Sequence, residues 1–319
     1  MKNLLIKSES ISDNLDIKYA DVVSIQNNLD ESYESLYESL GLVGEQYDLV
    51  YGYGDKKVID FTKFISKMLG CNYVLIPTIL EHDNIFRSKI TDLNNNFSTY
   101  YIHLDPLKII IDDNILKKVE IEKQSAGWAC IIASLTACYA WRNYPHYFKM
   151  EYDSEIDFEI NTCVSKIKAP DSEENRRELC NALKIFVDIE NTFDTNIFKE
   201  SAEHYFVYNL SKYTNLNCQF GEALALGILV ISHIINIGLA KRAHHCMNKA
   251  GLKCFLPSKK ILIKTLSTLK DFVEDNELNY SVINTKKFYL ADLNSIIDKV
   301  YLMGLDLNHK HEGGKLKIY

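Results

Sequence analysis

The chain has 319 residues, which is enough for one large domain or two ordinary ones with hydrophobic cores. Its composition, 47% hydrophobic and 25% charged, is typical of a soluble globular protein. The formal net charge of -7 at pH 7 argues against nucleic acid and anionic membrane surfaces as partners. We therefore expect neither a nucleic-acid partner nor a membrane partner.

Targeting and redox signals favour a cytoplasmic protein. Residues 1–9 lack the apolar core of a secretory signal peptide. The longest apolar run, residues 223–237, is too short to span a bilayer and contains His233, so we interpret it as a buried helix. The eight cysteines are scattered without a Cys-x-x-Cys pair, which favours reduced thiols and a cytoplasmic setting.

The first third of the chain alternates strand and helix patterns. Short apolar runs predict strands, and apolar residues at helical spacing predict helices. The strands are expected at residues 4–7, 20–25, 47–52, 72–78 and 107–111, and the helices at residues 29–40 and 58–69. This alternation indicates a parallel α/β domain, residues 1–115. Only about a dozen residues separate the first two strands, so the first connecting helix is expected to be trimmed or missing.

From residue 116 to residue 319 the patterns are helical. Helices are expected at residues 125–141, 172–188, 198–213, 221–237, 240–249, 259–272 and 290–302. No segment rich in Pro, Gly or Ser separates the two parts, so we expect them to pack closely with a cleft between them. The predicted fold is thus an α/β domain followed by an all-helical domain.

Several short motifs, in order, resemble one known family. They are residues 50–60 (Val-Tyr-Gly-Tyr-Gly-Asp-Lys-Lys-Val-Ile-Asp), 76–78 (Ile-Pro-Thr), 82–84 (His-Asp-Asn), 125–130 (Ser-Ala-Gly-Trp-Ala-Cys), 203–204 (Glu-His), 219–223 (Gln-Phe-Gly-Glu-Ala) and 279–283 (Asn-Tyr-Ser-Val-Ile). Together they resemble the sn-glycerol-1-phosphate dehydrogenase branch of the iron-containing alcohol dehydrogenase and dehydroquinate synthase-like superfamily. The resemblance runs from about residue 48 to residue 302. It implies a truncated Rossmann-like nucleotide-binding domain, a helical metal and substrate domain, and a strand at residues 279–283.

The resemblance also implies a metal site, from which this sequence departs. The family holds a divalent metal with an Asp and two His, and the corresponding positions here are Cys130, His204 and Phe220. A phenyl ring cannot ligate a metal, and a Cys would soften an oxygen site. Cys218 or Gln219 could substitute from nearby positions. Zinc or another divalent metal is therefore not expected; the alternative to a metal site is a cavity filled by Cys130 and Phe220, with His204 making an ordinary hydrogen bond.

The glycine-containing turn resembles the family's phosphate loop. By this resemblance NAD or NADP is the expected cofactor, and the expected cofactor-binding residues are Gly52, Gly54, Lys56, Lys57, Asp60 and Thr78. Asp55 stands where the family has a glycine and would oppose a phosphate by about 4 kcal/mol at about 4 Å. Lys56 and Lys57 could offset this repulsion. A solvated turn with its charges pointing outward is the alternative.

The catalytic and substrate candidates come from two other motifs. His204 or His82 could donate a proton to a developing alkoxide, with Asp83 orienting, and Lys63 and Asn84 could bind substrate. A loop-stabilising turn is the alternative for His82 and Asp83, and a solvent-facing side chain is the alternative for Lys63.

Two functions follow from this pattern. The first is a diverged oxidoreductase that transfers a hydride between NAD(P) and a small, phosphorylated ketone or alcohol, with a lost or rebuilt metal site. The second is a metal-free relative with lyase or synthase chemistry in a specialised biosynthetic pathway, or a non-catalytic partner of an active homologue. The expected partner is a small-molecule substrate, and the resemblance allows a homodimer.

Overall fold

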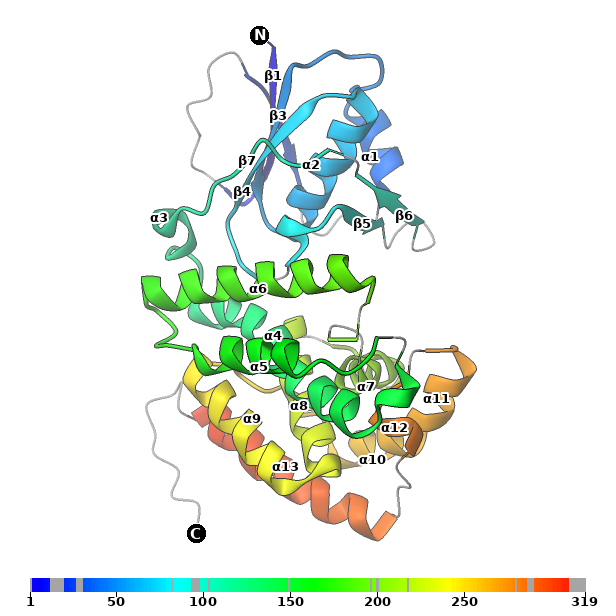
Figure 1. Ribbon diagram of the computed structural model, residues 1–319. Helices are drawn as coiled ribbons and strands as arrows, with labels where there is room; N and C mark the ends of the chain where they lie inside the picture. The colour runs from blue at the N-terminus through cyan, green and yellow to red at the C-terminus, as the bar shows by residue number, and fades with distance from the viewer. Residues whose placement is uncertain are drawn as a thin grey trace. The chain divides into compact units, whose positions relative to one another are not determined.

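Figure 1 shows the computed structural model, which divides into two compact units, Met1–Val119 and Glu120–Tyr319. The predicted boundary between residues 115 and 116 falls inside the short helix α3, Asp113–Leu116. The structure describes residues 2–11, 20–26, 31–81, 83–92, 98–102, 104–148, 150–195, 197–198, 201–216, 218–278, 280–285 and 290–309.

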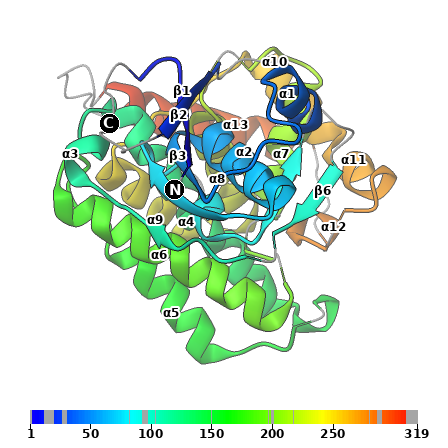
Figure 2. The ribbon, with the colours of Figure 1, turned by 90° about the horizontal axis from the view of Figure 1, so that it is seen from above.

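The N-terminal unit is built on a five-stranded sheet in the order β2-β1-β3-β4-β7. Every neighbouring pair is parallel, and Leu4 of β1 pairs with Asp21 of β2 on one side and Val50 of β3 on the other. Figure 2 shows β1, β2 and β3 side by side. The strands are β1 Asn3–Ser8, β2 Ala20–Ile25, β3 Leu49–Gly54, β4 Asn72–Pro77 and β7 Lys108–Ile109.

Helices α1 and α2 and an antiparallel pair of strands pack beside this sheet. Helix α2 (Lys56–Leu69) packs on β3 and β4, and its Phe64 meets the rings of Tyr33 and Tyr37 from α1 (Tyr33–Ser39). The antiparallel strands β5 (Lys89–Asp92) and β6 (Ser98–Tyr101) add Tyr100, whose ring lies 5.1 Å from that of Phe64. The 3₁₀ helix η1, Asp83–Phe86, follows β4.

The described secondary structure of the C-terminal unit consists of helices and their connecting loops. Its centre is α8, where residues 224–226 and 228–231 are fully buried, and α8 packs on α4, α7, α9 and α13. The α-helices are α4 Ile121–Asn143, α5 Ser154–Ser165, α6 Glu173–Phe193, α7 Ala202–Ser211, α8 Phe220–Ile235, α9 Ile237–Ala250, α10 Lys259–Ser267, α11 Leu269–Asp275, α12 Val282–Thr285 and α13 Leu290–His309; η2, Pro145–Tyr147, is a 3₁₀ helix. In the described residues no helix is long and apolar enough to cross a membrane.

The α/β and all-helical predictions are confirmed, with three corrections. The helix predicted over residues 259–272 is two helices, α10 and α11, that meet at Thr268. The strand expected at residues 279–283 is wrong where the chain is described, because Val282 and Ile283 begin α12. The strand predicted at residues 107–111 is only β7, two residues long. Asn279 and the residues 12–19, where a first connecting helix was expected to be missing, lie outside the described residues.

Candidate functional site

His204, in the first turn of α7, lies against the residue that begins α8. Its side chain is only 5% exposed, and its ring centroid lies 6.1 Å from that of Phe220, with the planes tilted by 33°. The structure therefore brings together two of the three positions predicted from the family's metal site. The Nδ1 atom of His204 is buried without a hydrogen-bond partner, 3.5 Å from Oε1 of Glu203.

The neighbouring Glu203 is a fully buried carboxylate with a donor on each oxygen. Thr136 Oγ1, on α4, donates to Oε2 of Glu203 at 2.5 Å, and Ser201 Oγ donates to Oε1. A buried carboxylate needs such donors because an unpaired charge in the interior is costly. Sequence reasoning missed Thr136, since it lies 67 residues before Glu203 on another helix. No pattern within a single helix reveals such a pairing.

Two glycines let α8 lie directly on its neighbours. A Cβ atom on Gly227 would come within 2.7 Å of the carbonyl oxygen of Glu203, and one on Gly221 would come within 2.8 Å of Ala126. Both distances are too short for any side chain. The backbones of α7, α8 and α4 therefore fix where residues 204 and 220 lie.

The donor set at these positions does not fit a divalent metal. Phe220 offers no lone pair, and catalytic zinc normally needs three protein ligands. Burial raises the pKa of the nearby Cys218 thiol to about 11, with Glu222 adding to the effect. Cys130 is half-buried on α4. In the described parts of the chain no three His, Cys, Asp or Glu side chains group as metal ligands.

In the N-terminal unit, the turn between β3 and α2 is closed by close packing. A Cβ atom on Gly52 would lie 2.3 Å from Thr62 Oγ1, and one on Gly54 would lie 2.5 Å from a methyl carbon of Val58. Because neither glycine has a side chain, the side chains of α2 can pack directly against the strand. The Asp55 carboxylate then caps the helix, because its Oδ1 accepts from the backbone N–H groups of Lys57 at 3.1 Å and Val58 at 3.4 Å.

The predicted ligand residues around α2 form one internal polar network. Lys56 Nζ binds Oδ2 of the buried Asp60 at 2.8 Å. Asn84 Nδ2 donates to Asp60 Oδ1 at 3.1 Å and to the Lys56 carbonyl at 3.3 Å. The structure therefore brings Lys56, Asp60 and Asn84 together, and their polar atoms bind one another.

Lys63 is fully buried and ties α2 to the segment after β4. Its Nζ donates to the carbonyls of Asn84 and Arg87, the latter at 2.9 Å. Burial lowers the pKa of Lys63 to about 8, while the nearby Asp60 acts in the opposite direction. The solvent-facing alternative for Lys63 is therefore wrong, because the side chain has no exposed surface.

Two further predicted residues, Thr78 and Asp83, follow β4. Thr78 is held by its backbone N–H, which donates to the Gly54 carbonyl at 2.9 Å. The Asp83 carboxylate accepts from Arg87 Nε at 2.9 Å, a partner that the sequence reasoning did not identify. His82 lies outside the described residues.

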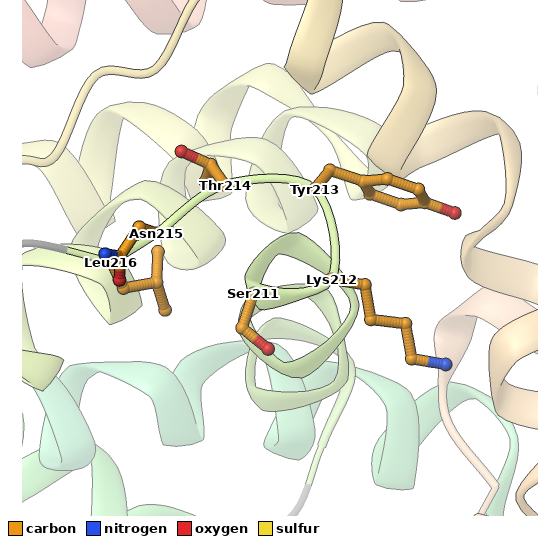
Figure 3. A pocket seen from close by; sticks show the side chains of 6 residues that line it. All are labelled: Ser211, Lys212, Tyr213, Thr214, Asn215 and Leu216. Carbon is orange, nitrogen blue, oxygen red and sulfur yellow. The ribbon is translucent and has the colours of Figure 1, made fainter.

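A surface depression of about 620 Å³ lies at the turn after α7 (Figure 3). Its lining comes from one continuous segment, Ser211 to Leu216, and includes none of the predicted site residues. Lys212 and Tyr213 point to one side of this turn in Figure 3, and Lys212 Nζ lies 4.1 Å from the centre of the Phe272 ring. This depression is a feature of a single turn without a cluster of catalytic groups.

No family model matches the chain, but curated proteins do. The chain is 24% identical over 195 residues to glycerol-1-phosphate dehydrogenase [NAD(P)+] of Pyrococcus horikoshii, a match that covers 59% of this chain and 56% of that protein. It is 26% identical over 245 residues to the protein of the same name from Methanococcus vannielii, covering 70% of this chain and 71% of the relative. Against the Pyrococcus protein, the chain thus spans little more than half of the relative's length.

Solved structures share the fold. Glycerol dehydrogenase from Schizosaccharomyces pombe matches with a TM-score of 0.66 and 12% identity, over 98% of this chain and 86% of that one. A 2-deoxy-scyllo-inosose synthase, complexed with carbaglucose-6-phosphate, NAD+ and Co2+, matches with a TM-score of 0.59 and 12% identity. This match covers 83% of this chain and 77% of the synthase. An iron-containing alcohol dehydrogenase from Corynebacterium glutamicum matches with a TM-score of 0.51 and 14% identity. This match covers 94% of this chain and 88% of the dehydrogenase. The resemblance inferred from the motifs and the α/β-plus-helical fold class are confirmed.

Proposed function

We propose that this chain, which fits the iron-containing alcohol dehydrogenase and dehydroquinate synthase-like superfamily, is a diverged glycerol-1-phosphate dehydrogenase-like oxidoreductase. Its proposed reaction is NAD(P)-linked hydride transfer to a small ketone, or from the corresponding alcohol, with a phosphorylated substrate as the first choice. The support is the similarity to curated NAD(P)-dependent dehydrogenases together with the match to their fold.

The observation that carries the proposal is the placement of His204 on α7. It is a buried histidine held beside a hydrogen-bonded carboxylate, at a position the family uses for its chemistry. In the proposed reaction the His204 side chain donates a hydrogen bond, and then a proton, to the carbonyl oxygen as negative charge develops there. The dinucleotide supplies or accepts the hydride when it is bound. The Phe220 ring lies beside the imidazole, 6.1 Å between ring centroids.

His82 is the second proton donor that we propose, with Asp83 orienting it. In the structure the Asp83 carboxylate accepts a hydrogen bond from Arg87 Nε. The substrate roles proposed for Lys63 and Asn84 require their internal hydrogen bonds to open. The cytoplasmic setting and a homodimer remain predictions.

A second candidate function is supported by the departures from the family. Phe220 removes a metal ligand, and Asp55 takes the first amides of α2. In the family, position 220 is a metal-binding histidine and position 55 is a glycine. A metal-free protein with lyase or synthase chemistry, or a non-catalytic partner of an active homologue, would need neither.

The test is a dinucleotide titration followed by an activity measurement. Purified protein is titrated with NADH and NADPH while nicotinamide fluorescence is followed, and reduction of dihydroxyacetone phosphate is measured by loss of absorbance. Saturable micromolar binding with turnover supports the dehydrogenase. Absence of binding, with and without added zinc, favours the second candidate.

A histidine variant identifies the proton donor. His204→Asn is expected to lower kcat at least a hundredfold while leaving dinucleotide binding within twofold, because loss of a general acid typically costs this much. His233→Asn is the matched control, since His233 is also a buried histidine of the helical unit, on α8, with its Nδ1 2.8 Å from the Leu229 carbonyl. Full activity in His204→Asn would show that another group donates the proton.

A further inference from the structure

The N-terminus of α2 is where a parallel α/β unit offers its best site for a diphosphate. Helix α2 follows β3 directly at the carboxyl end of the sheet. As in any α-helix, its first backbone N–H groups point out of its N-terminal end and lack partners within the helix. Such groups, together with the helix dipole, favour a bound phosphate. In this chain, however, a carboxylate of the protein already holds two of them.

The occupying group is Asp55, the N-cap of α2. One oxygen, Oδ1, accepts from the amides of both Lys57 and Val58, the donors that a phosphate oxygen would otherwise use. The next amide, that of Ile59, donates to the Asp55 carbonyl at 3.0 Å as the first hydrogen bond of the helix. Three successive N–H groups are therefore satisfied within the turn itself.

Two of the cations beside the turn are paired with groups of the protein as well. Lys56 Nζ pairs with the buried Asp60, and Lys63 Nζ donates to two backbone carbonyls. The two glycines of the turn give no additional room, because Thr62 and Val58 fill the space beside them. The two amides and the ammonium groups of Lys56 and Lys63 thus already have partners within the protein.

We propose that the Asp55 carboxylate acts as an internal substitute for a phosphate at the N-terminus of α2 and sets the dinucleotide affinity of the protein. A diphosphate that binds there must displace Oδ1 from two amides and approach its negative charge. Wild-type protein therefore binds NAD(H) and ADP weakly, and removal of the carboxylate strengthens both. This inference rests on the proposed dinucleotide-linked function, since it concerns the same cofactor.

The test compares two substitutions at residue 55. Asp55→Gly removes the charge and frees both amides, and glycine is itself an acceptable N-cap. We expect it to bind NADH and ADP at least tenfold more tightly than wild type, measured by nicotinamide fluorescence and by calorimetry. Asp55→Asn keeps an oxygen that caps the helix but removes the charge, so its gain is expected to be smaller. If Asp55→Gly does not fold, as judged by circular dichroism, Asp55→Asn must still bind ADP more tightly than wild type.

Two controls separate this effect from a general one. Adenosine has no diphosphate, so its affinity is expected to be the same in wild type and in both variants. Asp153→Gly is the matched protein control, because Asp153 caps α5 with the same pattern, accepting from Glu155 N at 2.7 Å and Ile156 N at 3.2 Å. It is expected to leave ADP affinity unchanged.

The outcomes distinguish this inference from the proposed function. Tight binding of NADH to wild type with no gain in Asp55→Gly would overturn the inference and leave the dehydrogenase proposal standing. Binding to Asp55→Gly alone would support the inference and contradict an NAD(P)-linked function of the natural protein. If NADH binds neither to wild type nor to Asp55→Gly, both the inference and the proposed function are overturned. If Asp55→Gly gains as much affinity for adenosine as for ADP, the inference is overturned, because the effect would then not depend on the diphosphate.

Discussion

The ring of His204 lies 6.1 Å from the ring of Phe220, centroid to centroid. Two histidines that bind one tetrahedral zinc at about 2.1 Å have ring centroids roughly 5 Å apart. Position 220 is therefore about as far from His204 as a second metal ligand would be, and only the chemistry of its side chain is unsuitable.

Restoring a donor at this position should restore metal binding. Phe220→His combined with Cys130→Asp gives the family's set of one Asp and two His, and we expect about one zinc per chain after dialysis against zinc and then against a weak chelator. Cys130→Asp alone is the control and should retain far less zinc. Metal analysis of the purified proteins is the measurement. Near-stoichiometric metal in the wild-type protein that survives chelation would contradict the argument from Phe220.

The Thr136 hydroxyl should stabilise the protein through Glu203. Thr136→Val removes the donor to Oε2 and leaves that oxygen of a fully buried carboxylate without its partner. We expect a loss of about 1–3 kcal/mol in the free energy of unfolding, measured by urea denaturation. Thr192→Val is the control, because Thr192 is exposed and donates within its own helix to the Asp188 carbonyl. An equal loss of unfolding free energy in both variants would show that the hydrogen bond to Glu203 stabilises the protein no more than an exposed one.

Lys63 should make stability rise with pH in mildly alkaline solution. Its pKa is about 8 in the folded protein against an ordinary 10.5, so between these values the unfolded chain binds more protons and the free energy of unfolding increases with pH. Below pH 8 both states are protonated, and the cost of the buried charge is constant. The shift sets an upper limit of about 3 kcal/mol. The two carbonyls that accept from Nζ favour the charged form, so we expect about 1–2 kcal/mol.

The measurement for Lys63 is a series of urea titrations between pH 7 and pH 10. Lys63→Met should lose the increase seen in the wild type. Lys67→Met, on the exposed side of the same helix, controls for the other groups that titrate in this range and should retain it. A wild-type stability that falls as steeply as that of Lys63→Met would mean that Lys63 keeps an ordinary pKa.

Gly54 should be required for packing even when no ligand is present. A methyl group at Gly54 would overlap Val58, at 2.5 Å, so Gly54→Ala is expected to lower the free energy of unfolding by about 1–3 kcal/mol. Gly238→Ala, on α9, is the control: the nearest atom outside its immediate neighbours is Asn236 Oδ1 at 3.2 Å, and alanine favours a helix. Thermal unfolding of both variants without ligand is the measurement. Normal stability of Gly54→Ala would indicate that this glycine serves a ligand instead.

The sequence predicted the regular elements well because their signals are local. Short apolar runs and helical apolar spacing located β1, β3, β4, α2, α4 and α8, since these elements are largely buried, and they also located β2, most of which is exposed or half-buried. Helix α5 was missed: Phe158 is 74% exposed, so its apolar pattern does not follow a buried face. The break at Thr268 was also missed, because it depends on local backbone geometry that no proline or glycine signals.

The candidate site was only partly predictable, for a different reason. The motifs identified His204, Phe220, Lys56, Asp60 and Asn84, which do lie in two groups. The partners of these residues came from distant segments, as with Thr136 and Glu203 or Lys63 and Arg87. Only the folded chain reveals that the polar atoms around α2 bind one another.

The contact between Gly227 and the backbone of Glu203 makes residue 220 an interchangeable position. Because main-chain atoms set the spacing between α7 and α8, replacing the side chain at residue 220 should leave His204 where it is. A panel of His, Cys, Asp and Glu at that one position would then compare nitrogen, sulfur and oxygen donors on the same backbone. The protein thus offers a ready scaffold for measuring how the choice of a single ligand selects one metal ion over another.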